Sequence, residues 1–151
     1  MPDLGDIQQL MTEGVPYNRV LGIRVASIAP EQVEVALPAA PERLNHVGTT
    51  HAAVQFGLGE ATAGTMVVAA FGDFQAQSYV PLAAQAEIKY RHPARGDLLG
   101  VATLSTAEQT RIRAEVAERG KARFTVPVQI LDAQETVVAE LSVQWVLVKQ
   151  R

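Results

Sequence analysis

One stretch of the chain, residues 44–64, starts polar and then becomes almost entirely apolar. Its second half consists mostly of Ala, Val, Leu, Phe and Gly, so the helix predicted over residues 50–64 is apolar on nearly every face. Such a helix is buried within a domain and does not lie on its surface. Gly48 and the Thr49–Thr50 pair supply a turn and hydroxyl groups for the helix N-terminus. The rest of the chain must therefore fold around this helix.

Glu60 is the exception within the predicted helix. A buried carboxylate is costly unless it is paired, hydrogen-bonded or used in chemistry. Burial also raises the pKa of a carboxyl group toward the range that suits a general base. We therefore take Glu60 as a candidate catalytic residue. The alternative interpretation is a structural carboxylate that forms a hydrogen bond across a subunit interface.

Apolar and polar residues alternate in much of the remaining chain, which is typical of half-buried strands. The expected strands are residues 23–37 (two strands or one long bent strand), 82–92, 98–104, 121–131 and 136–148. The expected helices are residues 6–13, a further turn at 17–21, and residues 109–119, which follow a capping box at Ser105–Glu108.

The connections between these elements are short. Pro93 and the turn at residues 95–97 predict that strands 82–92 and 98–104 form a hairpin. Residues 65–70 fit either the end of the central helix or a strand. An antiparallel sheet wrapped on one buried helix places the chain in the α+β class. We expect a single domain spanning residues 1–151.

Composition excludes several classes of function. The net charge of −3 gives no general attraction to nucleic acid or anionic lipid. Without cysteine there is no disulfide framework or thiolate site, and the three histidines lack the spacing of a metal site. We therefore expect no metal and no cofactor. The N-terminal residues do not have the pattern of a signal peptide, and no apolar run reaches membrane-spanning length, so we expect a cytoplasmic protein.

One set of residues carries a family resemblance: Asn45-His46-x-Gly48-x-x-His51, then Glu60, then residues 86–97 (AEIKYRHPARGD). This pattern resembles the hotdog-fold thioesterases over about the whole chain. It is most similar to the phenylacetic-acid-pathway type and to the uncharacterised family DUF4442 (YiiD C-terminal-like), which the insertion at 105–120 also resembles.

The resemblance implies a hotdog fold, in which a curled antiparallel sheet wraps around the central helix. Members of the superfamily form dimers whose sheets join edge to edge, and these dimers often pair into tetramers. Their active sites lie at the dimer interface and take residues from both subunits. The charged fraction of only 19% agrees with additional surface being buried in an oligomer.

The resemblance also implies roles for ten residues. Glu60 corresponds to the general base or nucleophile, Asn45 to a contact with the thioester or water, and Ala52 to the backbone N–H that polarises the carbonyl. His51 matches the histidine of a His-Gly-Gly motif, and Ser78 matches a hydroxyl from the opposite subunit. The expected substrate-binding positions, the last three near the nucleotide part of coenzyme A, are His46, Gly48, Arg91, His92 and Arg95.

A structural role is the alternative for most of these residues. His51 would then cap the helix, Asn45 would form a turn, and Ser78 would only start a strand. The arginines and His92 would be a solvated strand end, and the aromatic residues Phe56, Tyr90 and Trp145 are expected in the core or an interface. The family's Gly-Gly is replaced by Ala52-Ala53, whose methyl groups would crowd the carbonyl site or narrow the acyl tunnel.

Helix geometry puts Glu60 about 14 Å along the axis from His51. Either the regular helix begins after Ala52, or the substrate spans two subunits. The predicted function is hydrolysis of an acyl-CoA thioester. The alternative is a non-catalytic hotdog protein that binds acyl thioesters or fatty acyl groups. A dehydratase is less supported, because no His-Phe-Pro-Gly type of segment is present.

Overall fold

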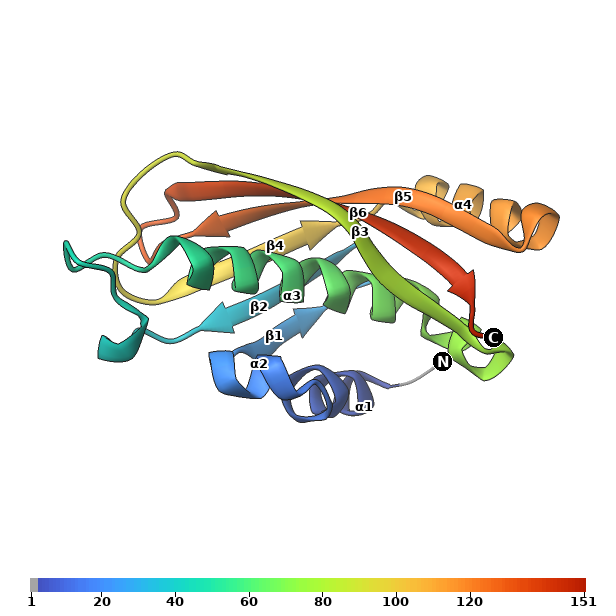
Figure 1. Cartoon of the computed structure of the whole chain (residues 1–151), viewed down its shortest axis with the longest axis horizontal. Coiled ribbons are helices and arrows are strands. Elements are labelled where there is room, and N and C mark those ends of the chain that lie inside the picture. The colour runs from blue at the N-terminus through green and yellow to red at the C-terminus, as the bar shows by residue number, and fades with distance from the viewer. Residues whose placement is uncertain (1–2) are drawn as a thin grey trace.

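The computed structural model describes residues 3–151, and its centre is the 20-residue helix α3 (Ala52–Phe71). One six-stranded antiparallel sheet curls around α3 in the order β1-β2-β4-β5-β6-β3 (Figure 1). The strands are β1 (Arg24–Ile28), β2 (Gln32–Leu37), β3 (Tyr79–Tyr90), β4 (Leu98–Thr103), β5 (Lys121–Leu131) and β6 (Val137–Lys149). The expected α+β class and hotdog fold are confirmed.

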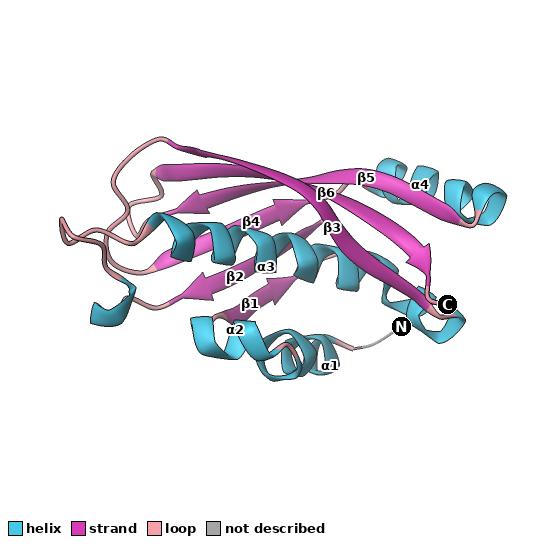
Figure 2. Cartoon of the chain, viewed as in Figure 1, coloured by secondary structure: helices cyan, strands magenta, loops and turns pink. Residues whose placement is uncertain are grey.

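The remaining helices lie at the borders of this sheet (Figure 2). At the N-terminus, α1 (Leu4–Gln9), a π-helical turn η1 (Leu10–Gly14) and α2 (Pro16–Leu21) pack beside α3 and β1. Two short 3-10 helices flank α3 in sequence, η2 (Pro41–Arg43) before it and η3 (Gly72–Gln77) after it. The helix α4 (Thr106–Arg119) connects β4 to β5.

The central helix is longer than expected, because residues 65–70 continue it as far as Phe71. Glycines let the helix approach the sheet closely. A Cβ at Gly59 would lie 2.5 Å from a methyl carbon of Leu141 on β6, and one at Gly100 on β4 would lie 2.1 Å from the Thr62 hydroxyl. Thr62 itself donates to the carbonyl of Leu58 at 2.6 Å, so its buried hydroxyl is satisfied within the helix.

The predicted hairpin between residues 82–92 and 98–104 is wrong. β3 pairs with β6, and β4 lies between β2 and β5. The connecting residues 91–97 do not turn tightly but cross the N-terminal end of α3, where Thr50 N–H donates to Ala94 O at 2.8 Å. Strands that are consecutive in sequence are often neighbours in a sheet, and here that tendency misleads.

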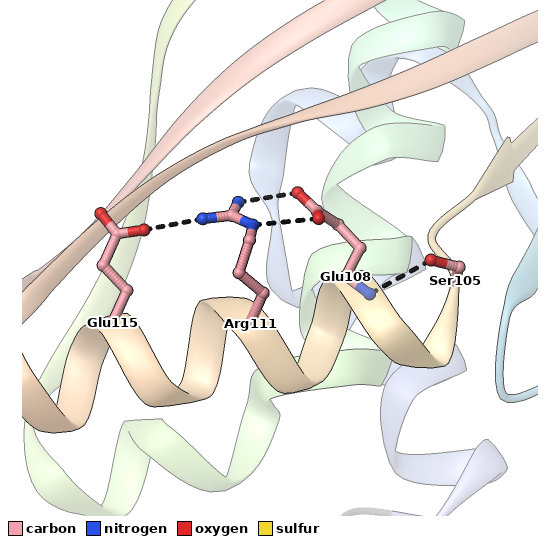
Figure 3. A network of polar contacts seen from close by, with 4 residues as sticks. All are labelled: Ser105, Glu108, Arg111 and Glu115. Atoms are coloured by element: carbon pink, nitrogen blue, oxygen red, sulfur yellow. Dashed lines mark hydrogen bonds and ion pairs between the residues drawn. The ribbon is translucent and has the colours of Figure 1, made fainter.

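The capping box before α4 is half formed (Figure 3). The Ser105 hydroxyl accepts a hydrogen bond from Glu108 N–H at 3.1 Å, and Gly120 ends the helix in the left-handed conformation, as expected. The Glu108 carboxylate does not accept the second hydrogen bond of the box, from Ser105 N–H, and instead pairs with Arg111 at 2.7 Å. Arg111 also reaches Glu115 at 2.8 Å, so the exposed face of α4 carries a short ion-pair chain.

The two edges of the sheet differ. The β1 edge lies against the N-terminal helices, and the Gln8 amide donates to Val25 O at 3.0 Å. Within residues 3–151, β3 pairs only with β6, so its other edge has no strand beside it. β3 exposes Leu82 (56% exposed), Ala83 and Ala84 near its middle. A long edge strand with exposed apolar residues is suited to pairing with another chain.

Candidate active site

A cavity of about 460 Å³ opens at the N-terminal end of α3. Residues 45–55 and 90–95, which are far apart in sequence, form its walls. Half of the ten predicted site residues line it, namely Asn45, Ala52, Arg91, His92 and Arg95. The structure therefore gathers these five around one end of the central helix.

This cavity has a buried floor and an exposed rim. Thr49, Thr50 and Gln55 are buried polar residues on the floor. The rim carries His92 and Arg95, which are exposed to solvent. A polar floor below a basic rim suits a ligand that has hydrogen-bonding groups along its length and an anionic end.

Asn45 organises the loop that leads to the helix. Its side-chain oxygen accepts from Val47 N–H at 3.0 Å and from Thr49 N–H at 3.1 Å. Its side-chain nitrogen donates to the Thr49 hydroxyl at 2.7 Å. These contacts form an Asx-type turn, and Gly48 completes it with a φ of +79°. The Asn45 amide is therefore engaged within its own loop in this chain.

His51 is the N-cap of α3. Its Nδ1 accepts a hydrogen bond from Ala53 N–H at 3.0 Å, and its backbone carbonyl accepts from Val54 and Gln55. Within residues 3–151, Ala52 N–H donates to no acceptor, and Ala52 is exposed. The first turn of α3 thus presents a free donor to the cavity, at the positive end of the helix dipole.

Tyr90 fixes this first turn from the sheet. Its hydroxyl donates to Ala52 O at 2.9 Å, which ties the last residue of β3 to the start of α3. Burial of the hydroxyl raises the pKa of Tyr90. Tyr90 is 47% exposed and lines the cavity, so it does not lie in the core of the chain, and its expected place in an interface stays a prediction. Gln55, also on the cavity wall, is a site residue that sequence reasoning missed.

Glu60 lies on the one stripe of α3 that the sheet leaves partly open. Residues 56, 60, 64 and 68, each four apart and so on one helix face, are less buried than their neighbours. The sequence predicts a helix that is buried on nearly every face, but in the structure this one stripe is partly exposed. Burial raises the pKa of the Glu60 carboxyl group. No side chain among residues 3–151 forms an ion pair with Glu60.

Glu60 does not line the cavity at the helix N-terminus. The regular helix begins at Ala52, so the expectation that it begins later is wrong. Eight residues of α-helix separate Ala52 from Glu60, which corresponds to a rise of about 12 Å. One thioester group cannot contact Ala52 N–H and the Glu60 carboxylate of the same chain.

Three other predicted residues lie outside this cavity. Ser78 follows η3, which continues the chain from the C-terminal end of α3. It has a φ of +64°, and its carbonyl accepts from Gln150 N–H at 2.7 Å. His46 is exposed in the loop before α3, and Gly48 makes the turn beside it. Within one chain, the structure does not bring Ser78 together with the other candidates.

Arg91 already forms an ion pair with a residue of the sheet. Its guanidinium pairs with Glu140 on β6 at 2.8 Å, in an exposed position, and its backbone N–H donates to Val138 O at 2.7 Å. Arg95 forms no ion pair with the residues that the structure describes. Arg95 is therefore better placed than Arg91 to contact an anionic ligand.

A smaller apolar cavity of about 170 Å³ lies beside the C-terminal half of α3. Val68 and Phe71 of α3, Leu10 of η1 and Pro81 of β3 contribute to its lining. Val68 belongs to the same open stripe as Glu60, two helical turns further along. The stripe therefore runs from the carboxylate to an apolar cavity.

Neither a metal site nor a membrane helix is found in the part of the chain that the structure describes. Residues 3–151 contain no cluster of three or more His, Asp or Glu side chains that could bind a metal ion. None of the helices in the same range combines the length and the hydrophobicity that crossing a bilayer requires.

The curled sheet around a long central helix is the architecture of the hotdog-fold thioesterase superfamily. Within it, the chain belongs to the family described as "Domain of unknown function (DUF4442)", whose model matches residues 6–147. No curated protein sequence matches the chain.

Solved structures agree with this assignment. A Pseudomonas aeruginosa protein of unknown function, described as a probable thioesterase, superposes with a TM-score of 0.87 at 27% identity, over 99% of both chains. The Staphylococcus aureus thioesterase SAV0944, solved as a mutant, gives 0.71 at 13% identity over 88% of this chain and 98% of its own. PaaI of the Escherichia coli phenylacetic acid degradation operon gives 0.69 at 17% identity, over 91% and 87%. At these low identities, the last two structures show a common fold with this chain and nothing more specific.

Proposed function

We propose that this protein is an acyl-CoA thioesterase whose catalytic base or nucleophile is Glu60. The observation that carries the proposal is the pairing of two features on α3. One is the unpartnered Ala52 N–H at the helix N-terminus, and the other is a half-buried carboxylate on the open stripe of the same helix. Thioester hydrolysis requires both a donor for the developing oxyanion and a group that attacks or activates water.

The complete site is formed by two copies of the chain. Within one chain the two groups are about 12 Å apart along the helix, so they cannot act on the same carbonyl. A second copy that pairs along the open β3 edge would bring its own α3 close to the first. Glu60 of one copy then faces the helix N-terminus of the other, which is also the arrangement that the family resemblance implies.

The chemistry follows from these positions. Ala52 N–H and the helix dipole stabilise the negative charge that develops on the thioester oxygen. The ionised Glu60 carboxylate attacks the carbonyl carbon or removes a proton from the attacking water. His51 and Asn45 position the first turn through the hydrogen bonds described above. Arg95 and His92 on the rim bind the phosphates of coenzyme A.

The acyl group runs along the open stripe toward the 170 Å³ cavity. Glu60 and Val68 are separated by two turns, about 12 Å of helix rise. Gly64, between them, is half-buried and has no side chain, and the position of a Cβ there lies 3.5 Å from Trp145 and 3.7 Å from Met11. This path favours an acyl group long enough to reach the apolar cavity, so medium-chain substrates are preferred over acetyl.

A panel of acetyl-, hexanoyl-, octanoyl-, palmitoyl- and phenylacetyl-CoA tests the proposal. We expect hydrolysis of at least one member and loss of turnover by about 100-fold or more in Glu60→Gln, with the oligomer intact. Unchanged turnover in Glu60→Gln would remove Glu60 from the mechanism. Tight binding with no hydrolysis across the panel would favour the non-catalytic alternative, which the extra methyl groups of Ala52-Ala53 also favour.

A further inference from the structure

Gln55 has a buried hydrogen-bond acceptor that nothing in the described chain satisfies. The residue is only 4% exposed and lies on the floor of the cavity at the α3 N-terminus. Its Nε2 donates to the carbonyl of Thr50 at 3.0 Å. Its Oε1 is buried and has no partner within residues 3–151. An unsatisfied buried acceptor is costly, so its partner is expected to come from outside the chain.

The orientation of this amide is fixed by its surroundings. If the oxygen and nitrogen were exchanged, the side-chain oxygen would face the carbonyl oxygen of Thr50, and two acceptors would oppose each other. The group without a partner is therefore an acceptor, and only a donor completes it. The neighbouring Asn45 amide does not serve, because its nitrogen donates to the Thr49 hydroxyl and forms no hydrogen bond with Gln55.

We propose that Gln55 recognises the pantetheine arm of the thioester carrier by accepting a hydrogen bond from one of its amide N–H groups through Oε1. This inference rests on the proposed function, because it takes the cavity as the carrier site. In coenzyme A and in acyl carrier proteins, this arm has two secondary amides between its sulfur and the phosphate to which its other end is joined. The cavity has the same sequence of features, with Gln55 on the floor and Arg95 on the rim.

The arm is common to coenzyme A and to acyl carrier proteins, so Gln55 contacts the part of the carrier that the two share. Coenzyme A adds a nucleotide, for which the basic rim is suited, whereas a carrier protein adds a folded domain. Gln55 is a specificity-determining residue in this scheme. It contacts the carrier and not the reacting carbonyl, so its loss raises KM more than it lowers kcat.

The test compares one acyl group on two thiols. Gln55→Met keeps the approximate size of the side chain and removes both polar groups. For an acyl-CoA we expect kcat/KM to fall about 2- to 12-fold, which is the effect of one net hydrogen bond. For the same acyl group on ethanethiol, which has no amide, we expect a clearly smaller loss, because only the loss of the Gln55–Thr50 hydrogen bond affects it. Equal losses on both thioesters would overturn the proposal, because they would indicate a purely structural role.

A matched control is available on α4. The Gln109 amide also donates to backbone carbonyls, at 2.7 Å to Pro30 and 2.8 Å to Leu104, but it lies outside this cavity. Gln109→Met therefore removes side-chain to backbone hydrogen bonds of the same kind, here in a partly exposed position, without touching the carrier site. We expect it to leave the ratio of rates for acyl-CoA and acyl-ethanethiol unchanged. A shift of that ratio equal to the one in Gln55→Met would contradict the proposal.

Binding measurements separate this inference from the proposed function. Calorimetry measures the binding of free pantetheine and free coenzyme A to the Glu60→Gln protein. Both ligands are thiols, so their binding does not depend on hydrolysis. We expect the added substitution Gln55→Met to weaken the binding of both ligands by the same factor. A pantetheine analogue with esters in place of its amides is expected to bind equally to the proteins with and without Gln55→Met. Absence of any pantetheine binding would overturn the inference, even if the protein hydrolyses thioesters. An equal loss with acyl carrier protein would extend it to both carriers.

Discussion

Glu60 and Ala52 lie on the same face of α3, eight residues apart, with a helical rise of about 12 Å between them. Because the helix is regular from Ala52 onward, no local distortion shortens this separation. The free N–H and the raised-pKa carboxylate of one chain therefore cannot contact the same carbonyl group. In the proposed function they belong to two different active sites. Two chains in a symmetric pair would complete both centres.

This arrangement predicts complementation between two inactive variants. Ala52→Pro and Glu60→Gln are co-expressed with different tags, and the mixed pairs are purified through both tags. Each mixed pair has one centre with both groups intact and one with neither. We therefore expect about half of the wild-type turnover, measured as thiol release from the best acyl-CoA.

The homogeneous variants are the controls, and each is expected to be nearly inactive. If the mixed pair is as inactive as they are, the two groups act within one chain or not at all. Size-exclusion chromatography with light scattering must show that all three preparations have the same oligomeric state.

Ala52→Pro is a second, separate prediction. Ala52 is the first residue of the helix, where proline is well tolerated because the N–H has no partner within the helix. The preceding His51 has φ −59° and ψ 140°, which is the conformation that a residue before proline prefers. We expect turnover to fall about 100- to 1,000-fold, while thermal unfolding stays close to that of the wild type. A large loss of stability would mean that proline disturbs the helix, and normal turnover would exclude this N–H as the oxyanion donor.

Much of the fold could be predicted from sequence, because local pattern and burial agree. The apolar stretch gave the central helix, and the alternation in residues 121–131 and 136–148 gave the long strand pair β5 and β6. Strand order could not be predicted, because the crossing at residues 91–97 depends on contacts with α3 and β6. A proline followed by a glycine turn looks the same in a hairpin and in such a crossing.

The site was predicted less completely. Asn45, Ala52 and Arg95, which lie in the loop before α3, at its start and after β3, line one cavity in the structure, and their roles there stay predictions. The structure leaves Ser78 and Glu60 apart from that cavity, and their contribution to it stays a prediction that depends on a second chain. Gln55 gave no sequence signal, because a glutamine in an apolar helix resembles any helix-forming polar residue. Its importance follows only from the unpaired oxygen in the folded chain.

The raised pKa of Glu60 predicts opposite effects of pH on stability and activity. Burial disfavours the charged form, so the folded state holds a proton that the unfolded state releases just above the ordinary pKa of 4.5. The contribution of Glu60 to stability is therefore complete below that value and is lost as the pH rises through the higher folded-state pKa. Hydrolysis, which needs the charged form, rises over the same window.

Denaturant unfolding of wild type and Glu60→Gln at a series of pH values measures the effect of pH on stability. We expect the free energy of unfolding of the variant to exceed that of the wild type increasingly as the pH rises. Glu118→Gln, which replaces an exposed carboxylate on α4 away from the proposed β3 interface, is the control for the loss of one surface charge. A constant difference between wild type and Glu60→Gln across pH would contradict the assignment.

Val68→Phe is expected to shorten the preferred acyl group. The cavity that Val68 lines has about 170 Å³, close to the roughly 150 Å³ of an apolar cavity that accepts benzene. A phenyl ring at this position fills most of that space. We expect kcat/KM for octanoyl-CoA to fall about tenfold or more, and that for acetyl-CoA to change little. Val20→Phe on the surface of α2, where Val20 is 81% exposed, is the control and should leave the chain-length profile unchanged.

The close approach of α3 to the sheet predicts a large effect from a single methyl group. A Cβ at Gly100 would lie 2.1 Å from the Thr62 hydroxyl oxygen and 3.1 Å from the Thr62 Cβ, so the helix and β4 must move apart. Overpacking of this kind destabilises a protein by about 1–3 kcal/mol. Gly64→Ala is the matched control, because its new methyl group would meet Trp145 at an ordinary 3.5 Å. We expect urea unfolding to show a clear loss of stability for Gly100→Ala and little loss for Gly64→Ala. Equal losses would mean that helix α3 does not pack against β4 as closely as the structure shows.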